Sequence, residues 1–171
     1  TYDPAEPTPH AGGALLGAGA GPVDNRALEA RADVLTFTLP PLAQDIEVIG
    51  PVFADLYVRS SLAYTDFFCR LCDVWPDGRS VNVCDGLVSV SPEVGEPRVD
   101  GSLRVRVGMA ATAYRFRRGH ALRLQVSSGA FPRYNRNLGL GESPWRGVRM
   151  RAAAQEVFHD RERPSALVLP A

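Results

Sequence analysis

The stretch GHALRLQVSSGAFPRYNRNLG, residues 119–139, indicates the fold class. In its first half polar residues alternate with three apolar ones: Leu122, Leu124 and Val126. This period of two is typical of a β-strand with one buried face. After Ser128-Gly129 the pattern breaks, and an aromatic and polar loop follows at residues 131–137. A strand that delivers such a loop is a common way to build an interaction surface.

The bulk composition is that of an ordinary globular protein. With 171 residues, 45% of them hydrophobic and 22% charged, the chain is long enough for one domain with a substantial core. The net charge is zero, which argues against a dedicated nucleic-acid binder because such proteins carry a basic excess. No apolar run approaches the ~20 residues that cross a bilayer, so no membrane partner is expected.

Composition also bears on the cellular location. All 19 basic residues are arginine, a bias that indicates a bacterial genome of high GC content. The three cysteines, an odd number without a secretory segment, favour a reducing compartment. We therefore expect a bacterial cytoplasmic protein. The chain opens on TYDPAEPTP without an initiator methionine and is expected to be part of a longer protein.

Short β patterns separated by Gly and Pro turns follow an extended, Pro- and Gly-rich segment at residues 1–26. One helical turn is expected at residues 27–32. The expected strands lie at residues 34–38, 46–49, 52–60, 65–75, 80–90, 102–107, 114–118, 122–127, 148–152, 155–158 and 166–169. About ten short strands with little helix predict an all-β domain, a jelly-roll β-sandwich of the galactose-binding-domain-like type over residues 27–171.

The sequence offers no catalytic constellation. The nearest approach to a Gly-x-Ser-x-Gly elbow is GESPW at residues 141–145, which lacks the second glycine. A triad also needs a histidine beside a nucleophile, whereas His10 and His159 stand beside turns and His120 opens a strand. We therefore predict no catalytic residue, and packing or surface roles for the histidines.

The signals for a metal or a cofactor are equally weak. Cys69 and Cys72 are three residues apart on an expected strand, so their thiols point to opposite faces. The glycine-rich stretch at residues 17–21 follows no strand and precedes Pro22, so it lacks the context of a phosphate loop. We predict neither a metal nor a cofactor. Four aspartates lie near one expected hairpin: Asp66, Asp73, Asp77 and Asp85. We expect them to form turns, and the alternative is that they bind a structural Ca²⁺.

Five blocks of the sequence, taken in order, carry a resemblance to a known family. They are TYDPAEPTPHAGG, GPVDNRALEARADVLTF, VRSSLAYTDFFCRLCDVWPDGRSVNVCDG, GHALRLQVSSGAFPRYNRN and HDRERPSALVLP. Together they resemble the C-terminal domain of serine hydrolases of the X-Pro dipeptidyl-peptidase and cocaine-esterase (CocE/NonD) type. The resemblance covers nearly the whole chain.

The resemblance implies a parent enzyme with an α/β-hydrolase domain, a helical cap and this C-terminal jelly roll. In that family the Ser-Asp-His triad belongs to the hydrolase domain, which agrees with the lack of a triad pattern in this sequence. The chain is then expected to be inactive by itself, to pack on the catalytic domain and to help shape the substrate pocket. The parent would cleave an ester or amide through an acyl-enzyme.

Protein interfaces favour aromatic and arginine anchors. The residues expected to contact the catalytic domain or its substrate pocket are Leu15, Leu16, Asp66, Phe67, Phe131, Arg133, Tyr134, Asn135 and Asn137. Two alternatives stay open. A carbohydrate-binding module would stack sugar rings on Trp75, Tyr134 and Trp145. A subunit-contact domain would form a homodimer through a sheet face that carries Arg104 and Arg123.

Overall fold

The computed structural model describes residues 1–143 and 145–170. Within them lie nine strands and one four-residue helix. They are α1 (Arg26–Glu29), β1 (Leu35–Thr38), β2 (Ile46–Ser60), β3 (Thr65–Val74), β4 (Ser80–Val90), β5 (Glu96–Pro97), β6 (Leu103–Phe116), β7 (Ala121–Ser127), β8 (Gln155–Phe158) and β9 (Ala166–Val168).

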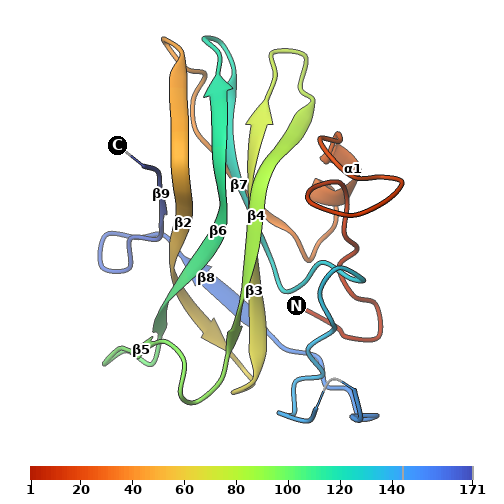
Figure 1. The fold of residues 1–171 in the computed structure, drawn as a ribbon. Helices are drawn as coiled ribbons and strands as arrows, with labels where there is room; N and C mark the ends of the chain where they lie inside the picture. Colours follow the sequence, from red (N-terminus) through yellow and green to blue (C-terminus); the bar gives the residue numbers. More distant parts are fainter. Residues whose placement is uncertain (144, 171) are drawn as a thin grey trace.

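These strands form two antiparallel sheets that pack face to face (Figure 1). The four-stranded sheet has the order β1-β7-β3-β4, and the five-stranded sheet has the order β5-β6-β2-β8, with β9 also paired to β2. The predicted all-β sandwich is therefore confirmed. Its finer assignment to the jelly rolls, and the division at residue 27, stay predictions.

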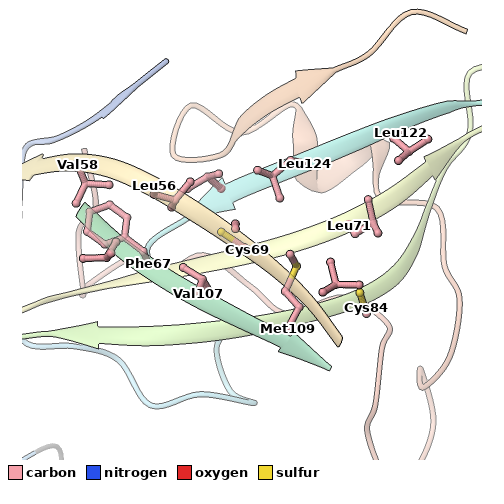
Figure 2. Packing of buried hydrophobic residues seen from close by; sticks show 14 of the residues in the cluster. Leu56, Val58, Phe67, Cys69, Leu71, Cys84, Val107, Met109, Leu122 and Leu124 are labelled. Atoms are coloured by element: carbon pink, nitrogen blue, oxygen red, sulfur yellow. The ribbon is translucent and has the colours of Figure 1, made fainter. Parts of the chain in front are cut away.

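The core lies between the two sheets and follows the period-two patterns of the sequence. Phe67, Cys69 and Leu71 of β3 face Val107 and Met109 of β6 across the interior (Figure 2). Leu122, Leu124 and Val126 of β7 join the same cluster, as predicted. Where β4 meets β6 the sheets approach so closely that a Cβ on Gly86 would lie 1.9 Å from the carbonyl oxygen of Gly108.

Several elements differ from the expected ones. The Gly50-Pro51 pair does not divide β2, because a register shift between Gly50 and Val52 absorbs the irregularity. The strands expected at residues 102–107 and 114–118 are one strand, β6, which continues through Gly108 without a turn. The strand expected at residues 148–152 is absent, and Val148 and Met150 are exposed there instead of packing on a sheet.

The outer face of the four-stranded sheet is covered by irregular chain. The N-terminal segment pairs with the long loop after β7 through the bridges Tyr2–Ala153 and Pro9–Phe131, and with β4 through Asp24–Val81. In Figure 1 this segment, α1 and the loop all lie on the β3–β4 side of the sandwich. The outer face of the five-stranded sheet has no such cover from the described residues.

The helix content of the chain is very small. The helix α1 has four residues, and among the described residues no helix is long and apolar enough to cross a membrane.

Candidate docking surface

Two segments that are far apart in sequence meet on the outer side of the four-stranded sheet. The backbone N–H of His10 donates to the carbonyl oxygen of Phe131 at 2.8 Å, and the N–H of Phe131 donates to that of Thr8 at 2.9 Å. The loop that follows β7 is thus bound directly to the N-terminal segment. The structure brings the two predicted contact regions, residues 15–16 and residues 131–137, to one side of the sandwich.

Leu15 and Leu16 lie in a small loop that is closed by mutual backbone hydrogen bonds between Gly13 and Gly21. Leu16 is fully exposed and Leu15 is 36% exposed. Gly13 has φ of 77°, a left-handed conformation that favours glycine. A Cβ on Gly13 would lie only 3.2 Å from the guanidinium of Arg133, so the base of this loop rests on that arginine.

We call the surface formed by these two segments the docking face. Its residues are Leu15, Leu16, Phe131, Arg133, Tyr134 and Asn135. Phe131 is 39% exposed, and the guanidinium of Arg136 lies 5.4 Å from the centre of its ring. Apolar tips beside an arginine and a tyrosine give the mixed character typical of the centre of a protein interface.

A buried ion pair lies between the four-stranded sheet and the docking face. Arg70 projects from β3 with no exposed side-chain surface and contacts the carboxylate of Asp85 on β4 at 3.0 Å. Arg70 also donates to the side-chain oxygen of Asn25 at 2.7 Å. Arg133 binds the other carboxylate oxygen of Asp85 at 2.5 Å. Asp85 therefore joins the sheet, through Arg70, to the loop that carries Arg133.

His10 completes this group, which we call the Arg70 network: His10, Asn25, Arg70, Asp85 and Arg133. One ring nitrogen of His10 lies 3.4 Å from the guanidinium of Arg70, and the other hydrogen-bonds to the carbonyl oxygen of Gly12. Burial lowers the pKa of His10, and the positive charge of Arg70 lowers it further. A neutral His10 is consistent with its place beside a buried cation.

A cleft of about 380 Å³, lined by both polar and apolar side chains, lies beside the docking face. Asp66 lines it and is 4% exposed, and Asn137 donates to its carboxylate at 2.8 Å. Burial raises the pKa of Asp66, although the hydrogen bond from Asn137 works in the opposite direction. Within residues 1–143 and 145–170, no basic side chain forms an ion pair with Asp66. Tyr64 and Tyr134 line the same cleft.

Phe67 occupies a different place from the other predicted contact residues. It is 2% exposed and belongs to the core between the sheets. Successive side chains of a strand point to opposite faces, so Phe67 points inward because its neighbour Asp66 points outward. Its side chain has no surface to offer a partner.

The sequence did not predict a buried ion pair at Arg70, and it predicted only a packing or surface role for His10. The available signal for Arg70 was its place between the apolar runs at residues 67–69 and 71–72, since a buried arginine needs a partner. His10, between Pro9 and a pair of glycines, carries no comparable signal.

Catalytic groups do not converge in the described part of the chain. The amide of Trp145 donates to the hydroxyl of Ser143 at 3.4 Å within a turn, and Pro144 of this stretch lies outside the described residues. His120 contacts the carboxylate of Asp73 at 2.9 Å and packs on Trp75. His159 packs edge-on against Phe37. No serine or cysteine among the described residues hydrogen-bonds to a histidine.

The cysteines and carboxylates behave as separate groups. Cys69 lies in the core, while Cys72 lies on the other side of the sheet near Ser80, and burial raises the pKa of Cys72 to about 12. The four carboxylates considered for Ca²⁺ have different partners: Asp66 has Asn137, Asp73 has His120, Asp77 has Arg79 and Asp85 has Arg70. No group of three potential metal ligands exists among the described residues.

Within each alternative hypothesis, the carbohydrate-binding module and the subunit-contact domain, the named residues do not share one surface. Trp75 follows the end of β3 with Arg79 stacked 4.2 Å from its ring centre, whereas Tyr134 packs on Phe68 near the start of β3. Trp75 and Phe68 are seven positions apart along an extended chain, which is about 23 Å. Arg104 belongs to β6 and Arg123 to β7, so these two point outward from different sheets.

The structure defines the chain as an all-β sandwich domain that carries a surface built from two segments far apart in sequence. Comparison with known proteins identifies it further: the X-Pro dipeptidyl-peptidase C-terminal non-catalytic domain matches residues 2–168. The chain belongs to this family.

Similar proteins agree with this assignment. The chain is 39% identical, over 99% of its length, to a cocaine esterase from Rhodococcus sp. (strain MB1 Bresler), and it spans 31% of that protein. An aminopeptidase from a marine sediment Thaumarchaeota archaeon is 25% identical with a TM-score of 0.82, and the chain covers 32% of it. An α-amino acid ester hydrolase is 23% identical with the same TM-score of 0.82 and shares the fold. The chain thus spans about a third of the relatives that it matches.

Proposed function

We propose that the chain serves as the non-catalytic C-terminal domain of a serine hydrolase that cleaves an ester or amide bond, including the X-Pro dipeptidyl-peptidase type. The docking face would pack on the α/β-hydrolase catalytic domain and help to shape its substrate pocket. The observation that carries the proposal is the convergence of Leu15, Leu16 and the loop at residues 131–137 on one supported surface.

The chemistry of the surface fits this role. Leu16 offers a fully exposed apolar side chain at the tip of a closed loop, and burying it against a partner would be favourable by about 1.5–3 kcal/mol. The Arg70 network fixes the position of the loop at residues 131–137 before any partner binds. A pre-organised surface loses less conformational entropy on docking. The proposal retains a bacterial cytoplasmic location, which the three buried free cysteines support.

The proposal is tested in the full-length hydrolase that carries this chain. Leu16→Asp places a charge on the docking face. We expect a lower melting temperature and a loss of at least about tenfold in kcat/KM for an acyl ester, equivalent to about 1.4 kcal/mol. The matched control is Val99→Asp. Val99 is 109% exposed, as Leu16 is 105% exposed, but it lies outside the docking face.

Equal effects of Leu16→Asp and Val99→Asp would overturn the docking assignment. The non-catalytic assignment is tested separately with the isolated chain. Turnover of the same ester by residues 1–171 alone would show that this chain carries its own active site.

A further inference from the structure

The cleft beside the docking face, which we call the Asp66 cleft, contains a buried negative charge. Asp66 lines the cleft from the start of β3, and it is 4% exposed. The groups that favour its charged form are neutral: the amide of Asn137, which donates at 2.8 Å, and the side chain of Ser89, which lies opposite on β4. Neutral donors offset only part of the cost of burying a carboxylate. Among the described residues, no cation completes this compensation.

The other charged groups that line the Asp66 cleft have partners of their own. The carboxylate of Glu142 accepts a hydrogen bond from Arg149 at 2.8 Å. The guanidinium of Arg136 donates to the carbonyl oxygen of Pro4 at 3.1 Å, which directs it toward the N-terminal segment. Within the described part of the cleft wall, the charge of Asp66 is therefore the one without an ionic partner.

The size and the walls of the Asp66 cleft suit an organic cation. Its volume of about 380 Å³ is in the range of clefts that hold small molecules. Tyr64 and Tyr134 line it, and the faces of aromatic rings attract cations. The guanidinium of Arg133 already lies 5.2 Å from the ring centre of Tyr134. A long basic side chain could thus reach Asp66 along aromatic walls.

A metal ion fits the Asp66 cleft less well than a basic side chain. Ca²⁺ takes about six to eight oxygen ligands, and the described residues contain no group of three potential metal ligands. An ammonium or guanidinium group brings its own N–H donors and can pair with a single carboxylate. The chemistry of the cleft therefore favours lysine or arginine.

The position of the Asp66 cleft indicates where such a side chain comes from. Tyr134 and Asn135 belong both to the docking face and to the lining of the cleft. A surface that covers the docking face would therefore also cover part of the cleft. Covering it removes water from around Asp66, which is costly for a carboxylate unless the covering surface supplies a cation.

We propose that the Asp66 cleft is the binding site for a basic side chain, lysine or arginine, that projects from the catalytic domain packed on the docking face. Its ammonium or guanidinium group would pair with the carboxylate of Asp66 between Tyr64 and Tyr134. This inference rests on the proposed function and adds the chemistry of the partner. The surface opposite the docking face carries a positive charge next to the apolar cover for Leu16.

The test follows the pH dependence of Asp66→Asn in the full-length hydrolase and in residues 1–171 alone. In the full-length protein a cation would lower the pKa of Asp66 below its unfolded value of about 3.9. The ion pair would then stabilise the protein above about pH 4 and be lost as the pH falls. We expect Asp66→Asn to lower Tm by at least about 2 °C at pH 7 and by less toward pH 4. In residues 1–171 alone, burial raises the pKa of Asp66, so the change with pH should have the opposite direction.

Asp55→Asn is the matched control. The partners of Asp55 are Arg104 and Arg106, which belong to this chain. Its pH profile should therefore have the same direction in the full-length hydrolase and in residues 1–171 alone. A reversal that occurs for Asp66→Asn and not for Asp55→Asn would show that the rest of the hydrolase supplies a cation to the Asp66 cleft.

Three results would overturn the proposal. The pH profile of Asp66→Asn could have the same direction in both forms, and the proposed function would survive this result if Leu16→Asp still impairs the hydrolase more than Val99→Asp does. A reversal together with equal effects of Leu16→Asp and Val99→Asp would mean that the cation comes from a surface other than the docking partner. An unchanged Tm with a higher KM only for substrates that carry a free amino group would assign the cleft to the substrate.

Discussion

Arg70 and Asp85 face each other across β3 and β4, and Arg106 and Asp55 face each other across β6 and β2. Both are cross-strand pairs of arginine and aspartate on the outer face of a sheet. The side chains of the first pair are 0% and 4% exposed, whereas those of the second are 57% and 13% exposed. The N-terminal segment and the loop after β7 cover the first pair and leave the second in solvent.

The two pairs differ in what they contribute to the fold. An exposed ion pair contributes little to stability, because water solvates both charges when the pair is broken. A buried pair holds two charges out of water and is favourable only while each has its partners. The Arg70 network is therefore expected to contribute more to the position of the loop at residues 131–137 than to net stability, because Asp85 joins Arg70 to Arg133.

The largest effect is expected from Arg70→Ala. This change leaves the carboxylate of Asp85 buried with Arg133 as its remaining partner, and it removes the donor to Asn25. We expect the free energy of unfolding to fall by about 3–5 kcal/mol, the usual result of breaking a buried pair from one side. Urea denaturation monitored by tryptophan fluorescence measures it.

A double variant separates the charge from the packing. Arg70→Met with Asp85→Leu removes both charges and keeps apolar volume, so it should recover most of the stability that Arg70→Ala loses. A double variant as unstable as the single one would show that the fold depends on the pair itself. We expect the double variant to recover stability but not the activity of the full-length hydrolase. The reason is that the loop carrying Leu15 and Leu16 would no longer have Asp85 beneath it.

The sequence correctly predicted which residues of β7 and of the β3–β4 hairpin belong to the core side of the sandwich. Leu122, Leu124 and Val126 were identified as core because a period of two and the flanking glycines are local signals. The hairpin of β3 and β4 followed from the Pro76-Asp77-Gly78 turn for the same reason. Such features depend on residues within a few positions of one another, and a single sequence displays them directly.

The Arg70–Asp85 pair could not be predicted in the same way. Close to the turn Val74 pairs with Ser80, and counting outward from there places Arg70 opposite Cys84. A register shift between Leu71 and Cys72 brings Asp85 opposite Arg70 instead. A slip of one residue exchanges the two faces of a strand, so an unseen bulge was enough to hide the network.

The sequence predicted the residues of the two segments of the docking face, but not that the two segments lie side by side. Its assembly rests on the bridge between Pro9 and Phe131, a long-range contact for which neither segment carries a signal. The assignment of Phe67 failed to distinguish the two faces of β3. Its neighbour Asp66 lies in the cleft, whereas Phe67 lies in the core.

Asp66 provides an intermediate test, because it is a buried carboxylate without a basic partner among the described residues. Burial raises the pKa of Asp66. The protonated carboxyl therefore contributes to the free energy of unfolding in full only below the unfolded pKa of about 3.9. That contribution is lost as the pH rises through the raised pKa of the folded state. We therefore expect Asp66→Asn to become more stable relative to the wild type between pH 4 and pH 7.

Asp55→Asn is the matched control for this pH profile. Hydrogen bonds from Arg106 lower the pKa of Asp55, so its contribution is present above about pH 4 and is lost as the pH falls. The two variants should thus change relative to the wild type in opposite directions in urea denaturation at a series of pH values. Parallel profiles would mean that Asp66 has a cationic partner in solution.

The smallest effect is expected from Arg106→Ala. Arg104 remains 3.2 Å from Asp55 after this change, and water solvates the carboxylate. The loss in the free energy of unfolding should be no more than about a fifth of that caused by Arg70→Ala, and it should shrink further at high salt. A loss comparable to that of Arg70→Ala would mean that the outer face of the five-stranded sheet is covered in solution. Concentration-dependent unfolding of the wild type would then favour the homodimer alternative, because a second copy would be the source of that cover.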